Sequence, residues 1–300
     1  MLNQSFETIK KLASGGMADI FLVRITSNDN AGEFRILKCI REECGSDEAI
    51  WNVIQKEENI SKTLEHPNIL RIYGTCLYEG RPALVMEYMD RDNIYFHWAR
   101  FAEKGEKIPM DAAIFMVREA ALGLHHCHEQ RDANGNLTGF VHRDISLLNI
   151  LLSSTGSVKI SDFGESITSA EQDADNSGYI VGNFQYISPE QAWGDRVDRR
   201  ADIFSLGVVL YELLTGAQLY PNIDFNRLIQ LVRIAQIPDI SERVTDLPEN
   251  LASITMKALN ADKKCRFNTA LEFADALTTV LNHLSPGYTA TKLASFLNQK

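Results

Sequence analysis

The chain has 300 residues, 45% of them hydrophobic, which is enough to bury a sizeable core in about two compact units. Its net charge of −10 disfavours non-specific binding to nucleic acid, because neutralising phosphates needs a basic surface. The N-terminus has no secretory pattern, and no run approaches the roughly 20 apolar residues of a membrane helix. We therefore expect a folded cytoplasmic protein, with no nucleic acid among its partners and no membrane segment in this chain.

The cysteines are odd in number and lack the paired spacing of a metal site. We predict that they are reduced thiols, as in a cytosolic protein, and that they form no zinc site. They are Cys39, Cys44, Cys76, Cys127 and Cys265.

Two strands are predicted within residues 6–23, joined by a turn of small residues that contains Gly15 and Gly16. Because glycine tolerates positive φ and has no side chain, backbone N–H groups of this turn are expected to be free to approach an anion. The alternative is an ordinary hairpin turn. The next strand, residues 34–40, has one interior cation, Lys38. Taken alone, a lysine in a strand is more often simply solvated.

A helix is predicted next, over residues 46–65, with Ser46 as its N-cap. At about 100° per residue, one face of this helix is apolar except for Glu57, which lies near its centre. A carboxylate on a packing face is costly unless a cation pairs with it, and we predict Lys38 as the partner. The residues of this face are Ile50, Val53, Ile54, Glu57, Ile60 and Leu64.

Strand-like runs at residues 69–73 and 83–88 complete a small sheet, and helical patterns replace strand patterns after residue 89. The first long helix is predicted over residues 111–129, where three histidines crowd the C-terminal end. Adjacent helix positions diverge by roughly 100°, so these histidines are interpreted as partners of the helix dipole rather than as metal ligands.

A nearly all-apolar, buried helix is predicted from Asp202 to Gly216. The last residues, 285–300, break at Pro286 and end in a short amphipathic segment. This tail is expected to be a short helix that either packs back on the chain or binds a partner.

The stretch around which the chain is organised begins near Asp144 and ends in a hairpin of two short strands, residues 150–152 and 158–160. Pairing of these strands brings Asn149 and Asp162 together at the open end, with Asp144 in the loop that feeds it. Two hard oxygen donors, one an amide and one a carboxylate, beside a second carboxylate are typical of a Mg²⁺ site for phosphoryl transfer. The alternative is that Asn149 and Asp162 only cap turns.

The motif His-Arg-Asp ending at Asp144, with Asn149 five residues on, and the motif Asp-Phe-Gly beginning at Asp162 resemble the catalytic loop and metal-binding triplet of the protein kinase family. The resemblance implies an α+β, two-lobed fold: an N-terminal ATP-binding lobe at 1–89, with a small antiparallel sheet and one helix, and a larger, mainly helical lobe at 90–284. ATP is expected in the cleft between the lobes.

The resemblance also implies a role for each matching residue. Asp144 is expected to accept the proton of the substrate hydroxyl, while Asn149 and Asp162 hold Mg²⁺ on ATP. Glu57 is expected to orient Lys38 on the α- and β-phosphates. In the family Met86 would be the gatekeeper, and the backbone of Glu87 and Met89 would face adenine. The nucleotide-binding positions implied in this way are Leu12, Ala13, Ser14, Gly15, Gly16, Ile20, Lys38, Met86, Glu87, Met89, Leu151 and Asp162.

Residues 165–182 are polar and weakly patterned, like the activation loop of the family. If a hydroxyl of this loop is phosphorylated, the resemblance implies that Arg143 binds the phosphate. The alternative is a flexible loop with no regulatory phosphate. The resemblance also pairs Glu190 with Arg266 and has Asp202 hold the catalytic-loop backbone. The candidate hydroxyls are Ser166, Thr168, Ser169, Ser177 and Tyr179.

Several positions depart from the family pattern. Ala13 and Ala18 replace glycines, Ser146 replaces a lysine, Asn183 replaces a threonine, and Glu165 stands where an apolar residue is more typical. The predicted function is transfer of the ATP γ-phosphoryl group to Ser/Thr hydroxyls of a protein substrate, together with autophosphorylation. One alternative is a pseudokinase or scaffold with little catalysis, and another is a small-molecule kinase. The sequence leaves open whether the chain forms a homodimer.

Overall fold

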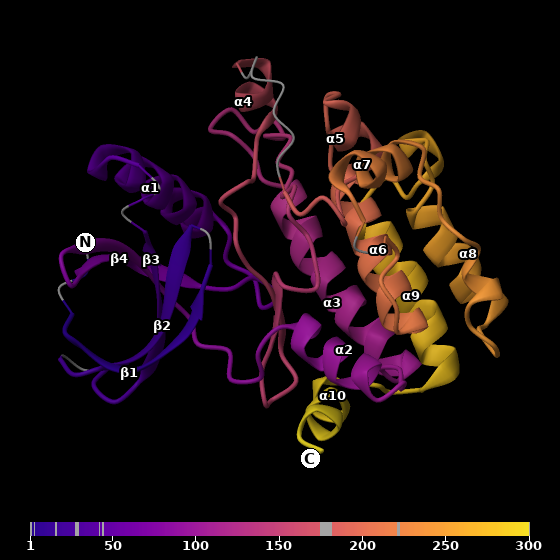
Figure 1. Cartoon of the computed structure of the whole chain (residues 1–300), viewed down its shortest axis with the longest axis horizontal. Helices are drawn as coiled ribbons and strands as arrows, with labels where there is room; N and C mark the ends of the chain where they lie inside the picture. The colour runs from indigo at the N-terminus through magenta and orange to yellow at the C-terminus, as the bar shows by residue number, and fades with distance from the viewer. Residues whose placement is uncertain are drawn as a thin grey trace. The chain divides into compact units, whose positions relative to one another are not determined.

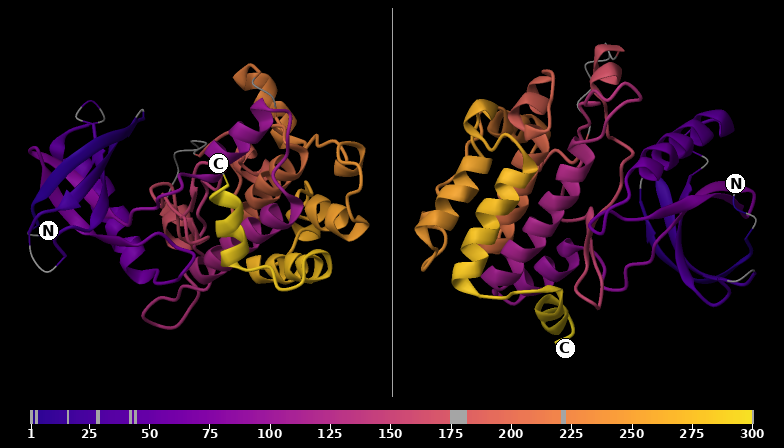
Figure 2. Two further views of the ribbon diagram at one scale, coloured as in Figure 1. Left: turned by 90° about the horizontal axis from the view of Figure 1, so that it is seen from below. Right: turned by 180° about the vertical axis from the view of Figure 1, so that it is seen from behind.

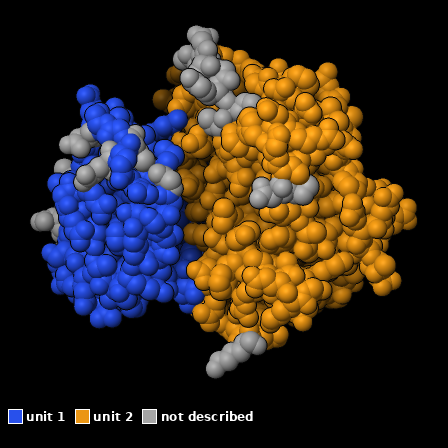
Figure 3. Space-filling view, viewed as in Figure 1, with its two compact units in different colours: residues 1–65, 69–90 blue, residues 66–68, 91–300 orange. Residues whose placement is uncertain are grey.

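The computed structural model describes residues 2, 4–15, 17–27, 30–41, 43, 45–174, 182–220 and 223–299. The chain divides into two compact units (Figure 3). Unit 1 comprises Met1–Glu65 and Ile69–Asp90, and unit 2 comprises His66–Asn68 and Arg91–Lys300. Among the described residues, no helix is both long enough and apolar enough to cross a membrane.

The described residues of unit 1 form one helix and a five-stranded antiparallel sheet in the order β1-β2-β3-β5-β4 (Figure 1). Lys38 lies opposite both Ile20 and Leu84, because its strand is the middle one. The elements are β1 (Phe6–Ser14), β2 (Ala18–Ile25), β3 (Phe34–Ile40), α1 (Asp47–Thr63), β4 (Ile72–Tyr78) and β5 (Arg81–Met86).

Helix α1 begins at the predicted cap, where the Ser46 side chain accepts a hydrogen bond from the Ala49 amide. Ile50 and Ile54 pack into an apolar cluster with residues of β3 and β5. Val53, which we placed on the buried face, is exposed. The other residues of that face are buried or half-buried, so the prediction was wrong at Val53 alone.

Unit 2 is mainly helical. Helix α6 is buried along nearly its whole length and packs against α3, α8 and α9 (Figures 1 and 2). A two-stranded hairpin, β6–β7, packs on α3. The elements are α2 (Ile94–Glu103), α3 (Met110–His128), β6 (Ile150–Leu152), β7 (Val158–Ile160), α4 (Ser169–Ala174), α5 (Pro189–Trp193), α6 (Arg200–Thr215), α7 (Phe225–Arg233), η2 (Ile240–Glu242), α8 (Glu249–Ala258), η3 (Lys263–Cys265), α9 (Ala270–Leu284) and α10 (Ala290–Leu297).

Helix α6 starts earlier than predicted. It begins at Arg200 rather than Asp202, with Arg199 as its N-cap residue and no side-chain capping bond. In the turn before it, the Asp198 side chain accepts a hydrogen bond from the Arg200 amide at 3.0 Å. The helix ends as expected at Gly216, whose φ of 72° is left-handed. Asp202 is therefore a buried residue within the first turn.

The tail packs within unit 2. In α10 Leu293 and Leu297 are buried, and the ring of Phe296 lies 5.6 Å from that of Phe101 in α2. Asn298 donates a hydrogen bond to the carbonyl of Ser154 in the β6–β7 turn and accepts one from Arg91. The tail therefore ties the hairpin turn to the first residue after unit 1 in the chain.

Candidate active site

The predicted ion pair is present in unit 1. The ammonium of Lys38 lies 3.0 Å from Oε2 and 3.2 Å from Oε1 of Glu57, and Glu57 is only 2% exposed. Burial removes both charges from water, so each charge depends on the other. The contact spans 19 positions of sequence and joins the middle strand to α1. This geometry fixes the direction of the lysine side chain.

The glycine-rich turn between β1 and β2 is partly closed by its own bonds. The Gly15 amide donates to the Ala18 carbonyl at 2.9 Å, so this N–H group is not free for an anion as we had expected. Asp19 holds the strand ends: it accepts hydrogen bonds from Lys11 and Ser14, which lower its pKa to about 2. Gly16 lies outside the described residues.

Most of the other positions predicted to bind the nucleotide lie in or next to strands. Leu12 and Ala13 lie in β1, Ala13 pairs with Ile20 of β2, and Met86 ends β5 opposite Ile36 and Ile72. Glu87 is held through its amide and its carboxylate, both of which bond the backbone of Arg71, while Met89 is buried. Leu151 lies in β6 of unit 2, opposite Lys159.

In unit 2 both carboxylate oxygens of Asp144 are held by nitrogen donors. The Asn149 side chain donates to Oδ2 at 2.7 Å and also to the Asp144 carbonyl, at 2.8 Å. The backbone amide of Asn183 donates to Oδ1 at 2.8 Å. Two donors on opposite oxygens fix both the position and the rotation of the carboxylate, as a positioned base requires.

Burial raises the pKa of Asp144, and the nearby negative charge of Asp162 adds to this effect. The amide of Asn183, the ring of His142 and the side chain of Asn149 counteract it. The charge of Asp162 is near enough to raise the pKa of Asp144, and Asn149 carries an amide oxygen as well as the nitrogen that bonds Asp144. A divalent cation fits these oxygen donors, because it would relieve the repulsion.

The hairpin has the predicted pairing, with Ile150 opposite Ile160. At its open end the Ser161 amide donates to the Asn149 carbonyl at 2.9 Å, which places Asn149 beside the residue before Asp162. Asp162 itself has a φ of 65°, in the left-handed region. Phe163 is buried against the ring of His142, so the chain after Asp162 is anchored.

Asp202 fixes the backbone of the catalytic loop, the role that the resemblance implies. Its fully buried carboxylate accepts hydrogen bonds at 2.9 Å from the amides of His142 and Arg143, and it contacts Nε2 of His128 at 2.7 Å. Burial raises the pKa of Asp202, but the contacts to His128 and His142 outweigh burial and hold it below its ordinary value. Arg143 has a φ of 68°, and these bonds stabilise that conformation.

Sequence reasoning missed the role of His128, which it had treated only as a helix-dipole partner. His128 and Asp202 are 74 positions apart, so no local periodicity connects them. Asn183 was also treated only as a lost threonine, whereas its backbone amide donates to the Asp144 carboxylate. The sequence cannot indicate such a bond, because every residue except proline carries the same backbone N–H donor. It becomes visible only in the three-dimensional structure.

The segment after residue 182 is anchored by buried polar contacts. Arg266 makes a two-pronged ion pair with Glu190, with both distances 2.8 Å, as the resemblance implies. At Gly182 the φ is 100°, and a Cβ would lie 2.6 Å from the Arg143 carbonyl, so only glycine allows this approach. Gln191 donates to the same carbonyl at 3.2 Å.

Three candidate hydroxyls of the activation loop are described. Ser166 is fully buried and donates to the Phe163 carbonyl, so our prediction of a modification site there is wrong. Thr168 and Ser169 begin a short helical segment, and the Thr168 hydroxyl donates to Glu171. Ser177 and Tyr179 lie outside the described residues.

Residues 6–283 match the protein kinase domain. The chain is 34% identical over 291 residues to tyrosine-protein kinase MasK of Myxococcus xanthus, covering 96% of this chain and 45% of the relative. It is 32% identical over 303 residues to serine/threonine-protein kinase PknB of Mycobacterium tuberculosis, covering 95% and 44%. A probable PknB of Lactococcus lactis is 28% identical over 277 residues, covering 91% and 42%.

The chain belongs to the protein kinase family, and its two-lobed α+β fold agrees with that family. Its similarity is to bacterial kinases, one named for tyrosine and others for serine and threonine. The chain spans less than half the length of these relatives.

Proposed function

We propose that this chain is an ATP-dependent protein kinase that transfers the γ-phosphoryl group to serine or threonine hydroxyls of a protein substrate. The single observation that supports this most is the held carboxylate of Asp144, which accepts one hydrogen bond on each oxygen. A group that only capped a turn would not need both oxygens fixed in a partly buried position. The relatives named as serine/threonine kinases favour this acceptor.

In the proposed mechanism Asp144 accepts the proton of the substrate hydroxyl as that oxygen attacks the γ-phosphorus. Asn149 and Asp162 would hold Mg²⁺, whose charge stabilises the phosphate oxygens when it is bound. Lys38, oriented by Glu57, would contact the α- and β-phosphates. Because the protein positions groups and makes no covalent intermediate, rigid hydrogen bonds around Asp144 are the main requirement.

The departures at Ser146 and Asn183 leave this proposal intact. Without the family's lysine at position 146, one donor to the transferred phosphate is absent, which can slow transfer about a hundredfold. The donor that threonine would give from its side chain at position 183 is also absent, but the backbone amide of Asn183 still donates to Asp144 at 2.8 Å. These observations favour a slow enzyme over a scaffold without catalysis.

A small-molecule kinase is a weaker candidate. The buried pair of Glu190 and Arg266, which fixes the segment after the activation loop, supports a platform for an extended protein substrate. A small acceptor would not need such a platform.

The proposal is tested by incubating the pure protein with Mg-ATP and a generic protein substrate, and then weighing both by mass spectrometry. We expect phosphate on serine or threonine, and Asp144→Asn should slow its incorporation by at least about a hundredfold. Arg227→Gln, a change on the exposed side of α7, is the control and should leave the rate unchanged. Phosphate only on tyrosine would reject the proposed acceptor, and unchanged transfer by Asp144→Asn would reject the base.

A further inference from the structure

The side chain of Asn298, just after α10, joins two parts of unit 2 that are far apart in sequence. It accepts a hydrogen bond from Nε of Arg91 at 3.0 Å, and it donates one to the Ser154 carbonyl at 3.0 Å. The first contact spans 207 positions of sequence and the second spans 144. One residue of the tail therefore connects the segment that enters α2 with the turn that follows β6.

The two segments that Asn298 connects are themselves paired. The Arg91 amide donates to the Leu152 carbonyl at 3.1 Å, and the Leu152 amide donates to the Asp92 carbonyl at 2.9 Å. An isolated antiparallel bridge pairs Leu151 with the residue before α2. Strand β6 therefore has β7 on one edge and the segment that enters α2 on the other. The tail closes this small ladder at the end where the turn lies.

The ladder contains a position that is predicted to bind the nucleotide. Leu151 is the middle residue of β6, and its side chain is half-buried. Met89, another of the predicted positions, precedes Arg91 by two residues in the sequence. Because β6 has only three residues, it makes few ladder bonds, and its exact position depends on the segments on either side of it. Contacts that fix the ladder therefore also fix Leu151.

Apolar contacts hold the tail independently of the bonds that Asn298 makes. Leu293 and Leu297 of α10 are buried. Before the helix, the ring of Tyr288 lies 5.3 Å from that of Phe115 in α3. Because α10 is packed at several points, the Asn298 side chain starts from a fixed position, and the entropy that its hydrogen bonds cost is small.

We propose that Asn298 is a positioning residue for the nucleotide. Through Arg91 and the turn after β6, it holds the ladder in the arrangement in which Leu151 contacts the nucleotide, and it thereby raises nucleotide affinity from outside the binding site. The match to the protein kinase domain ends at residue 283, so this contribution comes from the tail and not from the matched domain. The inference rests on the proposed function, because it needs a nucleotide at Leu151.

The test uses the whole 300-residue chain and Mg-ADP, with the affinity measured by calorimetry. Asn298→Ala removes both bonds from an exposed position, so the protein should remain folded and bind Mg-ADP about threefold to tenfold more weakly. Without nucleotide, the amides of Arg91 and Leu152 should exchange at least about threefold faster. With Mg-ATP, KM should rise while kcat stays within about twofold, because the bonds on Asp144 do not involve the tail.

A double-variant cycle tests the route through Arg91. Arg91→Met keeps the stem of the side chain and removes the guanidinium, so it should also weaken the binding of Mg-ADP. Combined with Asn298→Ala it should add little, because both variants remove the same contact. Asn298→Asp keeps an acceptor for Arg91 and loses the donor to Ser154, so it should recover part of the affinity.

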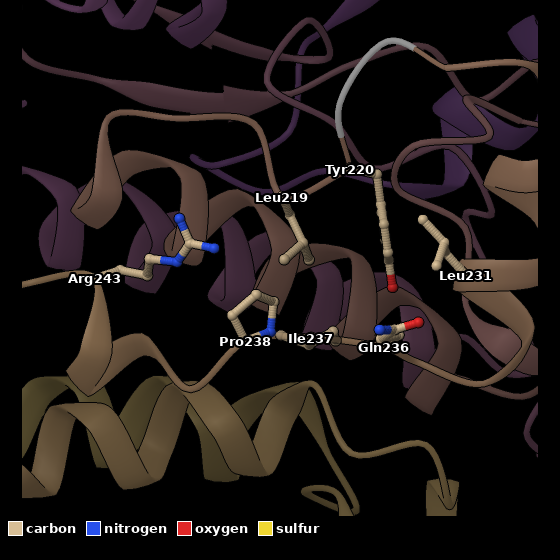
Figure 4. Close-up of a pocket in the computed structure, with 7 residues that line it drawn as sticks. All are labelled: Leu219, Tyr220, Leu231, Gln236, Ile237, Pro238 and Arg243. Carbon is tan, nitrogen blue, oxygen red and sulfur yellow. The ribbon is translucent and has the colours of Figure 1, made fainter.

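Arg243→Met is the matched control for Arg91→Met. Arg243 is an exposed arginine at the end of η2, and Figure 4 shows it at a hollow of about 400 Å³ that Leu219 and Pro238 also line. The described lining residues of this hollow belong to α7, to η2 and to the connections around α7, and none belongs to α10 or to the β6 ladder. This variant should bind Mg-ADP as the original chain does.

Four results would overturn the role of the tail. They are an unchanged affinity for Mg-ADP in Asn298→Ala, amide exchange at Leu152 that does not respond to this change, losses in Asn298→Ala and Arg91→Met that simply add, and an equal loss in Arg243→Met. The affinity and exchange measurements need no catalysis. A chain that binds Mg-ADP but transfers no phosphate therefore rejects the proposed function alone, whereas a chain that binds no Mg-ADP rejects both.

Discussion

The carboxylate of Asp144 shows how a single residue is prepared for its task. Burial alone raises its pKa, and a base that stays protonated at neutral pH cannot accept a proton. The donors from Asn149 and Asn183 favour the ionised form and oppose the effect of burial. One donor is a side chain and the other is backbone, so they respond differently to substitution.

We predict that Asn149→Ala shifts the acidic limb of the pH dependence of kcat to higher pH. Removing the side-chain donor takes away an interaction that lowers the pKa of Asp144, so this pKa rises further above its ordinary value. Activity depends on the ionised form, and it should therefore be lost at a higher pH as the solution is acidified. The measurement is kcat against pH with saturating Mg-ATP.

Asn183→Ala is the matched control for this shift. Its backbone amide still donates to Asp144, so the position of the acidic limb should stay where it is in the original chain. A drop in kcat without movement of the limb in Asn149→Ala would mean that Asn149 acts only through the metal ion. An equal shift in both variants would contradict the assignment of the donors.

At the scale of elements, the hairpin turn and the tail helix depend on each other. Gly156 in the β6–β7 turn has a φ of 83°, and a Cβ there would lie 1.9 Å from the Ala290 carbonyl at the start of α10. Glycine is needed twice at this position, once for the backbone angle and once for the approach of α10. The match to the kinase domain ends at residue 283, so α10 is an addition that this turn accommodates.

We predict that Gly156→Ala costs at least about 3 kcal/mol of stability, because the left-handed angle and the overlap with α10 add together. Gly135→Ala is a close control: its φ is 84°, but no atom lies within 4 Å of an added Cβ. That change should cost about 1 kcal/mol, the penalty of the backbone angle alone. Urea unfolding measures both, and hydrogen exchange over residues 290–297 reports whether α10 has come away.

Equal losses for the two glycine variants would show that α10 moves aside without cost. Protection of residues 290–297 that is unchanged in Gly156→Ala would contradict the packing of the tail on the turn. Either result would mean that α10 is only loosely attached to the β6–β7 turn.

The features that could be predicted from sequence depend on short-range patterns. Helical periodicity placed Glu57 on a buried face and identified Lys38 as its partner, and turn chemistry identified the β6–β7 hairpin. The pairs of Asp202 with the loop amides and of Glu190 with Arg266 came only from the resemblance. Nothing local indicates the contact of His128 with Asp202, because the two residues meet only after the chain has folded.

Two errors have the same physical origin. The start of α6 was placed at Asp202 because an aspartate suits a first turn, but the helix begins two residues earlier, after a turn in which the Asp198 side chain accepts a hydrogen bond from the Arg200 amide. The Gly15 amide was expected to be free, but the turn closes on the Ala18 carbonyl. In both places several residues satisfy the same rule, and only the three-dimensional path of the chain decides among them.

At the scale of the whole molecule, the residues proposed to bind the nucleotide are divided between the two compact units. Lys38 and Glu57 belong to unit 1, while Asp144, Asn149 and Asp162 belong to unit 2. Each set is held by contacts within its own unit. If one nucleotide contacts both sets, both units contribute to its binding free energy. A substitution that removes a contact in one unit must then weaken the nucleotide binding that is measured in the other unit.

We predict that a non-hydrolysable ATP analogue with Mg²⁺ slows hydrogen exchange in both units, over β1 to β3 and over residues 141–164. Lys38→Met in unit 1 should raise the analogue concentration that is needed to protect residues 141–164 by at least about tenfold. A loss of this size is expected when one charged hydrogen bond to phosphate is removed. Lys264→Met, which removes a lysine from η3 of unit 2, is the control and should leave that concentration unchanged. Protection of residues 141–164 that does not respond to Lys38→Met would mean that the units do not share one nucleotide. The proposed roles of Lys38 and Glu57 would then have to be abandoned, while the assignment of Asp144 would still rest on its own hydrogen bonds.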